Sequence, residues 1–385
     1  MSLRVPFARP DIRDEEIAAV TRVLRSGWLT TGPEAQAFER ELAARLGAKH
    51  AIAVVSGTAA LHLALEAAGI GPDDEVIVPT WTFTASAEVA RYLGARPVIV
   101  DVRAADLNVD VAAVERAITE RTKAIVGVDI GGQPCDWHRL RDLAGAREVV
   151  LVDDAAHALP ATLRGELIGT WADLTAFSFY VTKTLATGEG GMLVTASDRW
   201  AERARVMSLH GISHDAWKRY TAEGTWRYEV IAPGFKYNMT DVAAALGRVQ
   251  LSRLDAMKGR RETIARRYTD AFAEDDALEP PVVASDRESA WQLYILRLRL
   301  EVLRHDRAVF IEQLRQRGIG TSVHFIPLHL HPYWRDTYRL RPQDFPVATR
   351  EYERVISLPI YSAMSDDDVT AVIDAVRAVV RADRR

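Results

Sequence analysis

The sequence predicts an α/β protein whose first part is an open, mostly parallel sheet with helices on both faces. Between about residues 50 and 200, short runs rich in Val and Ile alternate with longer stretches rich in Ala and Leu. This alternation is typical of parallel strands joined by crossover helices. Strands are expected at residues 75–79, 97–102, 124–130, 149–153, 174–179 and 191–195. Ligands of such sheets bind beyond the carboxyl ends of the strands.

The length of the chain predicts two domains. With 385 residues, of which 48% are hydrophobic, the chain exceeds the size at which a single core usually stops growing. Helical periodicity over residues 240–267 leads out of the large domain, and strand-like alternation at 289–300 and a helix at 307–317 follow. We expect a large domain over residues 1–250 and a smaller C-terminal α+β domain over 251–385. Residues 217–233 show no clear period and are expected to form an irregular excursion near the site.

Composition and charge narrow the class of partner. The 49 Lys and Arg nearly balance the 53 Asp and Glu, so no strong field favours nucleic acid or an anionic membrane. Small molecules and copies of the same chain are the expected partners. The single Cys135 excludes an internal disulfide, and from the sequence we expect neither a signal peptide nor a membrane-spanning helix. A cytoplasmic protein is expected.

A lysine and an aspartate follow two of the predicted strands. Lys183 lies in FSFYVTKTLATGEGG, between a strand end and a glycine-rich turn. A lone lysine is usually a solvated surface charge, but a lysine that forms a Schiff base needs a protected pocket and a neutral amine. Asp154 ends an earlier strand, where a buried carboxylate can hold the proton on the ring nitrogen of pyridoxal phosphate. As an alternative, Asp154 caps a helix and His157 packs in its first turn.

A phosphate site is predicted at the start of the helix that follows Ser56. Gly57, Thr58 and Ala59 occupy the first turn, where unpaired backbone amides attract phosphate. The helix dipole contributes only about 0.3–1 kcal/mol at an exposed site, so hydroxyl groups such as those of Thr58 and Ser178 must add to it. Ordinary helix capping by Ser-Gly-Thr is the alternative.

An aromatic side chain after another strand can stack on a pyridine ring. The segment PTWTFT, residues 79–84, offers Trp81 and Phe83. Phe83 is the preferred candidate. In isolation, both rings would be interpreted as core residues.

Seven ordered motifs resemble the DegT/DnrJ/StrS family of pyridoxal-phosphate-dependent nucleotide-sugar aminotransferases. The resemblance covers nearly the whole chain and implies an aspartate-aminotransferase-like fold (PLP fold type I), with pyridoxal 5'-phosphate as cofactor and pyridoxamine 5'-phosphate between the half-reactions. The matching segments are SGWLTTGP (26–33), SGTAALHLAL (56–65), DEVIVPTWTFTAS (74–86), VDDAAHALPA (152–161), FSFYVTKTLATGEGGM (177–192), GFKYNMTDVAAALGRVQL (234–251) and ISLPIY (356–361).

The resemblance also implies a role for each matching residue. Lys183 matches the Schiff-base lysine and Asp154 the partner of the ring nitrogen, so these two are the expected catalytic residues. The expected cofactor contacts are Gly57, Thr58, Ala59, Phe83, Asp154, His157 (near the ring's phenolic oxygen), Ser178, Lys183 and Asn238.

Asn238 matches a residue that reaches the phosphate from the other subunit, which implies a homodimer with shared sites. One departure concerns this contact, because many relatives have Arg at the position of Asn238 and Asn at that of Lys236.

Substrate contacts are expected in two further segments. The loop of residues 26–33 lies over the active site in the family, which points to Thr30 and Thr31. His324 and His329, in HFIPLHLH, match a segment near the substrate entrance, although packing is an alternative for both. The spacing of His329 and His331 suggests a metal, but no carboxylate or cysteine accompanies them at ligand spacing, so no metal is predicted.

The function implied by the resemblance is transfer of an amino group from L-glutamate to a keto sugar, by a ping-pong mechanism. The GFKYNMTD and ATGEGGM variants favour a dTDP- or UDP-linked 4-keto-6-deoxy sugar and a 4-amino product. The Arg- and Ala-rich composition is compatible with a high-GC actinobacterial source and an antibiotic-type sugar. Alternatives are amination at C3, a cyclitol or carbocyclic acceptor, and a cofactor-binding regulator, although no DNA-binding segment is evident.

Overall fold

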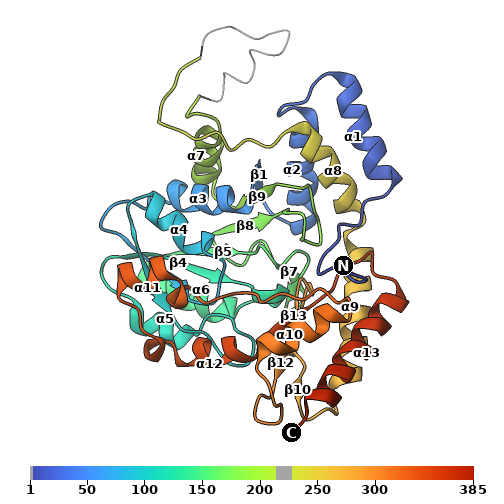
Figure 1. Ribbon diagram of the computed structural model, residues 1–385. Helices are drawn as coiled ribbons and strands as arrows, with labels where there is room; N and C mark the ends of the chain where they lie inside the picture. The colour runs from blue at the N-terminus through green and yellow to red at the C-terminus, as the bar shows by residue number, and fades with distance from the viewer. Residues whose placement is uncertain (1–2, 214–227) are drawn as a thin grey trace.

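A seven-stranded sheet forms the centre of the computed structural model, which describes residues 3–213 and 228–385 (Figure 1). The strand order is β1-β9-β8-β5-β4-β2-β3, and only β9 runs against its neighbours. Most of the irregular excursion expected at 217–233 lies outside the described residues. The strands are β1 (His50–Val54), β2 (Glu75–Pro79), β3 (Arg96–Val100), β4 (Thr122–Val128), β5 (Val150–Asp154), β8 (Leu174–Ser178) and β9 (Gly191–Thr195). The mostly parallel α/β sheet is confirmed.

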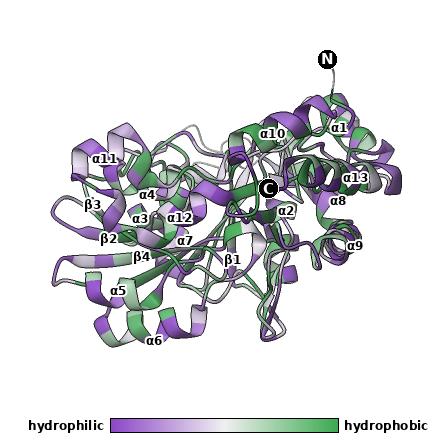
Figure 2. Ribbon diagram, turned by 60° about the horizontal axis from the view of Figure 1, so that its bottom comes forward, coloured by the Kyte–Doolittle hydropathy of each residue, from purple (hydrophilic) through white to green (hydrophobic). Residues whose placement is uncertain are grey.

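Helices cover both faces of this sheet. One face carries α3 (Gly57–Ala67), α4 (Ala85–Tyr92) and α7 (Asp198–Ser208), and the other carries α2 (Pro33–Leu46), α5 (Val111–Ala117), α6 (Trp137–Arg147) and α8 (Asp241–Ser252). Each face encloses a separate hydrophobic cluster. Figure 2 shows the hydrophobic colour along strands such as β4 and mixed colours on the surrounding helices. Because both faces are covered, the buried strands have continuous apolar sequences.

The stretch expected as one helix over residues 240–267 consists of two helices. α8 ends at Ser252 and α9 (Leu254–Phe272) begins at Leu254, with Arg253 at φ −101° and ψ 1° between them. The Arg253 side chain forms ion pairs with Asp11 and Glu16 near and within α1 (Asp14–Ser26). These contacts hold the junction between α8 and α9. The apolar periodicity of the sequence does not indicate them.

A second core is built mainly from the C-terminal part of the chain. It contains the antiparallel strands β10 (Leu278–Glu279), β12 (Tyr294–Leu298) and β13 (Val355–Leu358), with α9, α10 (Arg307–Gln316) and α13 (Asp366–Asp383) around them. A small three-stranded sheet, β11 (Arg287–Glu288), β6 (Thr162–Leu163) and β7 (Glu166–Leu167), also joins the two parts of the chain.

Two segments cross between the cores. Val5, near the N-terminus, packs in the C-terminal core. In the other direction, α11 (Pro332–Tyr338) and α12 (Pro346–Arg354) return to the first core and lie beside α4 and α5 in Figure 1. Within residues 3–213 and 228–385, no helix combines the length and the apolar character needed to cross a membrane.

Candidate active site

Lys183 lies in a tight loop between β8 and β9, at the carboxyl edge of the parallel strands. Its backbone amide donates to the carbonyl oxygen of Tyr180 (2.8 Å), and the Thr187 amide donates to that of Phe179 (2.9 Å). The lysine is partly buried. Burial lowers the pKa of Lys183 to about 8; the Asp154 carboxylate opposes this shift and the charge of Arg261 adds to it. The neutral amine is therefore accessible near neutral pH, at about one molecule in ten at pH 7.

Asp154 is the last residue of β5, and its carboxylate is buried. Ser86 donates its hydroxyl to Oδ2 (2.6 Å), and the Ala156 amide donates to Oδ1 (3.3 Å). Burial raises the pKa of Asp154, while these two donors and the nearby Lys183 oppose that shift. Residues 156–160 form turns, so Asp154 does not cap a helix. The structure thus places a carboxylate and the amine of Lys183 within electrostatic reach of each other.

His157 is buried against Phe325, with the two rings stacked at 5.7 Å and 16°. The amide of Gly131 donates to Nδ1 (3.3 Å). Burial, with the charges of Lys183 and His324, lowers the pKa of His157 well below its usual value. The ring is therefore neutral, and because Nδ1 accepts a hydrogen bond, Nε2 carries the proton.

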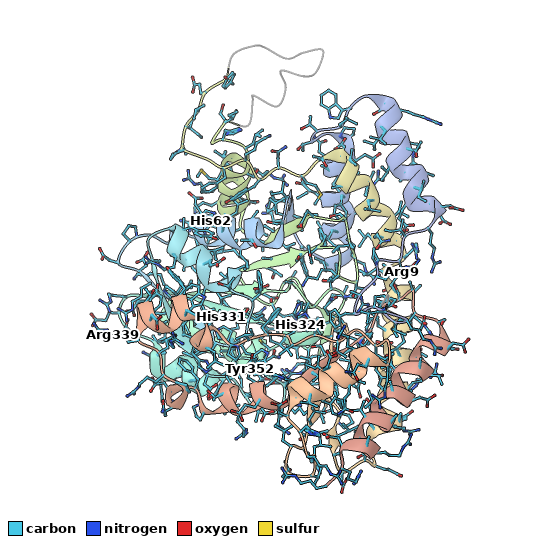
Figure 3. The ribbon with its side chains drawn as sticks, viewed as in Figure 1. Arg9, His62, His324, His331, Arg339 and Tyr352 are labelled. Atoms are coloured by element: carbon cyan, nitrogen blue, oxygen red, sulfur yellow. The ribbon has the colours of Figure 1, made fainter. Side chains whose placement is uncertain are left out.

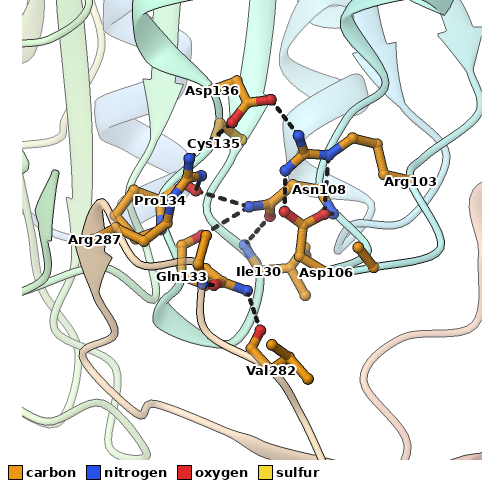
Figure 4. A network of polar contacts seen from close by, with 12 residues as sticks. Arg103, Asp106, Asn108, Ile130, Gln133, Pro134, Cys135, Asp136, Val282 and Arg287 are labelled. Atoms are coloured by element: carbon orange, nitrogen blue, oxygen red, sulfur yellow. Dashed lines mark hydrogen bonds and ion pairs between the residues drawn. The ribbon is translucent and has the colours of Figure 1, made fainter.

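The loop that presents the Gly131 amide is fixed by a polar network (Figure 4). Asn108 donates through Nδ2 to the carbonyl oxygens of Gln133 (2.9 Å) and Pro134 (3.1 Å) and accepts from the Ile130 amide (2.9 Å). Arg287 binds the same loop at Pro134 O. This network sets the orientation of the Gly131 amide and, through it, the tautomer of His157.

The start of α3 forms a narrow cradle with the end of β8 and the start of β9. Ser56 caps the helix by accepting from the Ala59 amide (3.0 Å), so the amides of Gly57 and Thr58, rather than that of Ala59, remain for a phosphate. A Cβ at Gly57 would lie 2.8 Å from the Cβ of Ser178, and one at Gly191 would lie 2.4 Å from the carbonyl group of Ser56. Only glycine fits at both positions.

Phe83 and Trp81 differ in what they can contact. Trp81 is fully buried and donates Nε1–H to the carbonyl oxygen of His324 (2.9 Å). Phe83 is 58% exposed, with its ring 5.9 Å from that of Phe325. The ring of Phe83 is thus available to a ligand, whereas Trp81 is a core residue.

Residues 10–377 match the model of the DegT/DnrJ/EryC1/StrS aminotransferase family. The chain belongs to this family. The spore coat polysaccharide biosynthesis protein SpsC of Bacillus subtilis is 50% identical over 378 residues, which are 98% of this chain and 97% of SpsC.

Two solved structures are similar over nearly their whole length. Spr1654 of Streptococcus pneumoniae, known in PLP and PMP forms, gives a TM-score of 0.92 for the PMP form at 35% identity, covering 98% of this chain and 100% of that chain. DesV of S. venezuelae, in complex with a ketimine intermediate, gives 0.87 at 36% identity over 98% of each chain. The chain is a pyridoxal-phosphate-dependent sugar aminotransferase of PLP fold type I, as the sequence predicted.

The residues present fit the cofactor of the family. The cradle at Gly57 and Gly191, which a Cβ would fill, lies beside the hydroxyl of Ser178 and suits a phosphate group. At the same sheet edge are the amine of Lys183 and the buried carboxylate of Asp154. An anion site, an amine of lowered pKa and a buried acid are the three features that pyridoxal phosphate requires.

The loop of residues 26–33 docks on the start of α8. Asp241 accepts hydrogen bonds from the amides of Gly32 (2.7 Å) and Ala35 (3.0 Å), and Thr30 is exposed. Thr31 accepts from Asn238 Nδ2 (2.6 Å).

Asn238 is buried and accepts from Lys236 Nζ (2.6 Å). It also pairs with Val54 at the carboxyl end of β1. Thr31 and Asn238 therefore form a second polar group near the start of α3.

The two expected substrate histidines have different environments. His324 is partly buried, shares a hydrogen bond with Ser357 (3.0 Å), and has its pKa lowered to about 4 by burial and by Lys183. His329 is fully buried, and both ring nitrogens are bonded, Nδ1 to Thr80 (2.8 Å) and Nε2 to Thr349 (2.9 Å). This geometry favours the packing alternative for His329.

His331 does not complete a metal site with these histidines. In Figure 3, His324 lies toward the centre of the molecule and His331 beside α11. Across residues 3–213 and 228–385, no three His, Cys, Asp or Glu side chains are grouped to hold a metal ion.

Four residues at the site did not emerge from the sequence. Ser86 and Phe325 contact Asp154 and His157, Gln292 contacts the Lys183 loop, and Arg261 binds the backbone of Gln292. Ser86 and Phe325 belong to motifs that also hold expected site residues. Their position in the sequence close to those residues could have indicated that they belong to the site. Gln292 and Arg261 give no comparable signal, because their contacts join distant parts of the chain.

Proposed function

We propose that this enzyme transfers the amino group of L-glutamate to a nucleotide-linked 4-keto-6-deoxy sugar, the nucleotide being dTDP or UDP, and produces a 4-amino sugar. The observation that carries the transamination chemistry is the lowered pKa of Lys183 beside the buried carboxylate of Asp154. The choice of sugar is supported by the GFKYNMTD and ATGEGGM segments.

The side chains of this chain have distinct tasks around the cofactor. Pyridoxal phosphate, when bound, supplies a carbonyl group that combines with amines and a ring that accepts electron density. Lys183 would hold the cofactor through its amine and, as a free amine, would move a proton at the α-carbon of the donor. Asp154 would hold the proton on the ring nitrogen, and Nε2–H of His157 would be available as a donor to the phenolic oxygen. Phe83 covers one face of the ring.

The remaining groups hold the cofactor in place. The amides of Gly57 and Thr58 and the hydroxyl of Ser178 bind the phosphate. Because glutamate and the keto sugar would use the same site and the same lysine in turn, 2-oxoglutarate would leave before the keto sugar binds, and ping-pong kinetics are expected. Thr30, Thr31 and His324 are the proposed contacts of the sugar nucleotide.

The assembly is proposed to be a homodimer in which Asn238 reaches the phosphate of the partner's site. Within each chain, residues 1–250 are proposed as the cofactor-binding domain and 251–385 as the small domain, although α11 and α12 pack on the first core.

The test is the absorption spectrum of the purified protein with pyridoxal phosphate, before and after addition of glutamate. A visible band that requires Lys183 and disappears with glutamate is expected, and Lys183→Ala serves as control. A panel of nucleotide-linked and free keto sugars and cyclitols then identifies the acceptor. Substantial turnover by Lys183→Ala, or a band that persists in that variant, would exclude the proposed role of the lysine.

A further inference from the structure

Gln292 contacts the residues on either side of Lys183. It is buried in the segment that leads into β12. Its Nε2 donates to the carbonyl oxygen of Thr182 (2.8 Å), and its Oε1 accepts from the amide of Thr184 (3.1 Å). One side chain from the C-terminal part of the chain therefore holds both peptide groups that flank the lysine.

Arg261, on α9, fixes the backbone that carries Gln292. Its Nη1 donates to the carbonyl oxygens of Trp291 (3.1 Å), Gln292 (3.4 Å) and Ile360 (2.8 Å), and the side chain is buried. A guanidinium presents its donors in a rigid plane. Movement of Gln292 away from the Lys183 loop would therefore break its side-chain bonds to that loop and also the bonds between its backbone and Arg261.

We propose that Gln292 is a positioning residue for Lys183, because its amide clamps the two peptide groups from which the lysine side chain is directed into the site. The assignment rests on the role proposed above for Lys183. The lysine stem is flexible, so the volume open to its amine depends on how firmly its own backbone is held. With both flanking peptides fixed, the amine stays in the buried region near Asp154, where burial lowers its pKa.

Gln133 provides a matched control. It is also buried, and its side chain makes the same pair of bonds to another segment: Nε2 donates to the carbonyl oxygen of Val282 (3.2 Å), and Oε1 accepts from the amide of Ala284 (2.9 Å). In both cases the glutamine binds two residues that are two positions apart in the sequence. Of the two segments, only the loop held by Gln292 contains Lys183.

The experiment measures the labelling of Lys183 by an amine-reactive reagent in the cofactor-free protein as a function of pH, with mass spectrometry of the labelled peptide. Methionine keeps the length of glutamine but cannot form either bond. For Gln292→Met, we expect the midpoint to move up by about one pH unit, because the freed amine is better solvated, and labelling at pH 8 to fall about fivefold. Gln133→Met should keep the wild-type midpoint.

An unchanged midpoint in folded Gln292→Met, or an equal shift in Gln133→Met, would overturn the proposal. Thermal unfolding of both variants establishes that each is folded. If Gln292→Met does not fold, Gln292→Asn replaces it, since its shorter amide cannot bridge both peptide groups; the same upward shift is expected, and its absence is equally decisive. The labelling requires neither cofactor nor turnover, so it is independent of the spectroscopic test of Lys183.

Discussion

The charge of Asp154 depends on a short chain of buried hydroxyl groups. Ser86 donates to the carboxylate (2.6 Å) and is itself 2.6 Å from the hydroxyl of Thr82. Both hydroxyl residues are buried. A donor to a carboxylate stabilises the ionised form, and burial alone would leave Asp154 protonated over a wider range of pH. The role of Asp154 at the ring nitrogen therefore depends in part on Ser86.

Ser86→Ala should move the acid limb of the kcat/KM profile to higher pH. Removal of the donor disfavours the carboxylate, so the pKa of Asp154 rises further, and a higher pH is needed to ionise it. A hydrogen bond to a charged group contributes about 1.5–3 kcal/mol, which corresponds to about one to two pH units. The measurement is kcat/KM for glutamate against pH.

Ser208→Ala is the control for this prediction. Ser208 is also buried, and its hydroxyl donates to the carbonyl oxygen of Arg205 (2.8 Å) within α7 rather than to Asp154. Its acid limb should match that of the wild type. A Ser86→Ala profile that overlays the wild type would show that Ser86 does not support the charge of Asp154.

The residues that could be predicted from the sequence share one property, their position at the end of a strand. Lys183, Asp154 and Phe83 each follow an apolar run, and parallel strands bring such positions to one edge. Ser86 bonds to a residue 68 positions away, and Gln292 to one 108 positions away. Periodicity within a single element carries no information about such pairs.

At the scale of elements, close approach between the start of α3, the end of β8 and the start of β9 shapes the cradle. Gly191→Ala would place a Cβ 2.4 Å from the carbonyl group of Ser56, so the helix or the strand must shift. We expect a loss of about 1–3 kcal/mol in the free energy of unfolding, and a weaker affinity for pyridoxal phosphate. Chemical denaturation and a cofactor titration measure the two effects.

Gly259→Ala separates this effect from the general cost of replacing glycine. Gly259 lies within α9, and a Cβ there would meet no atom within 4 Å. Alanine should therefore raise stability by about 0.5–1 kcal/mol and leave the cofactor affinity unchanged. Equal cofactor affinity in Gly191→Ala and the wild type would show that the cradle does not hold the phosphate.

The elements themselves were predictable to different degrees. The six strands expected from apolar runs end within two residues of their observed limits. β1 was not expected, because two of the five residues of its sequence HAIAV are alanine, which is depleted in strands. The break at Arg253 depends on ion pairs with residues near the N-terminus, which the helical period cannot indicate.

At the scale of the whole molecule, the position of Asn238 links the fold to the proposed dimer. In one chain it lies beside the end of β1 and donates to Thr31. This places it close to the start of α3 of its own chain, whereas the family resemblance assigns its phosphate contact to the partner's site. The two arrangements predict different behaviour when inactive variants are mixed.

Lys183→Ala and Asn238→Ala should each be inactive alone and should regain activity when they are dissociated, mixed and reassociated. In a mixed dimer with shared sites, one site receives its lysine from one chain and its asparagine from the other, and both are intact there. Random pairing makes half of the dimers mixed. By two-fold symmetry each mixed dimer has one complete site out of two, so about one quarter of the wild-type activity is expected. Each variant taken through the same treatment alone is the control. If Asn238 serves the site of its own chain, every site in the mixture lacks one of the two groups, and activity remains at the level of the separate variants.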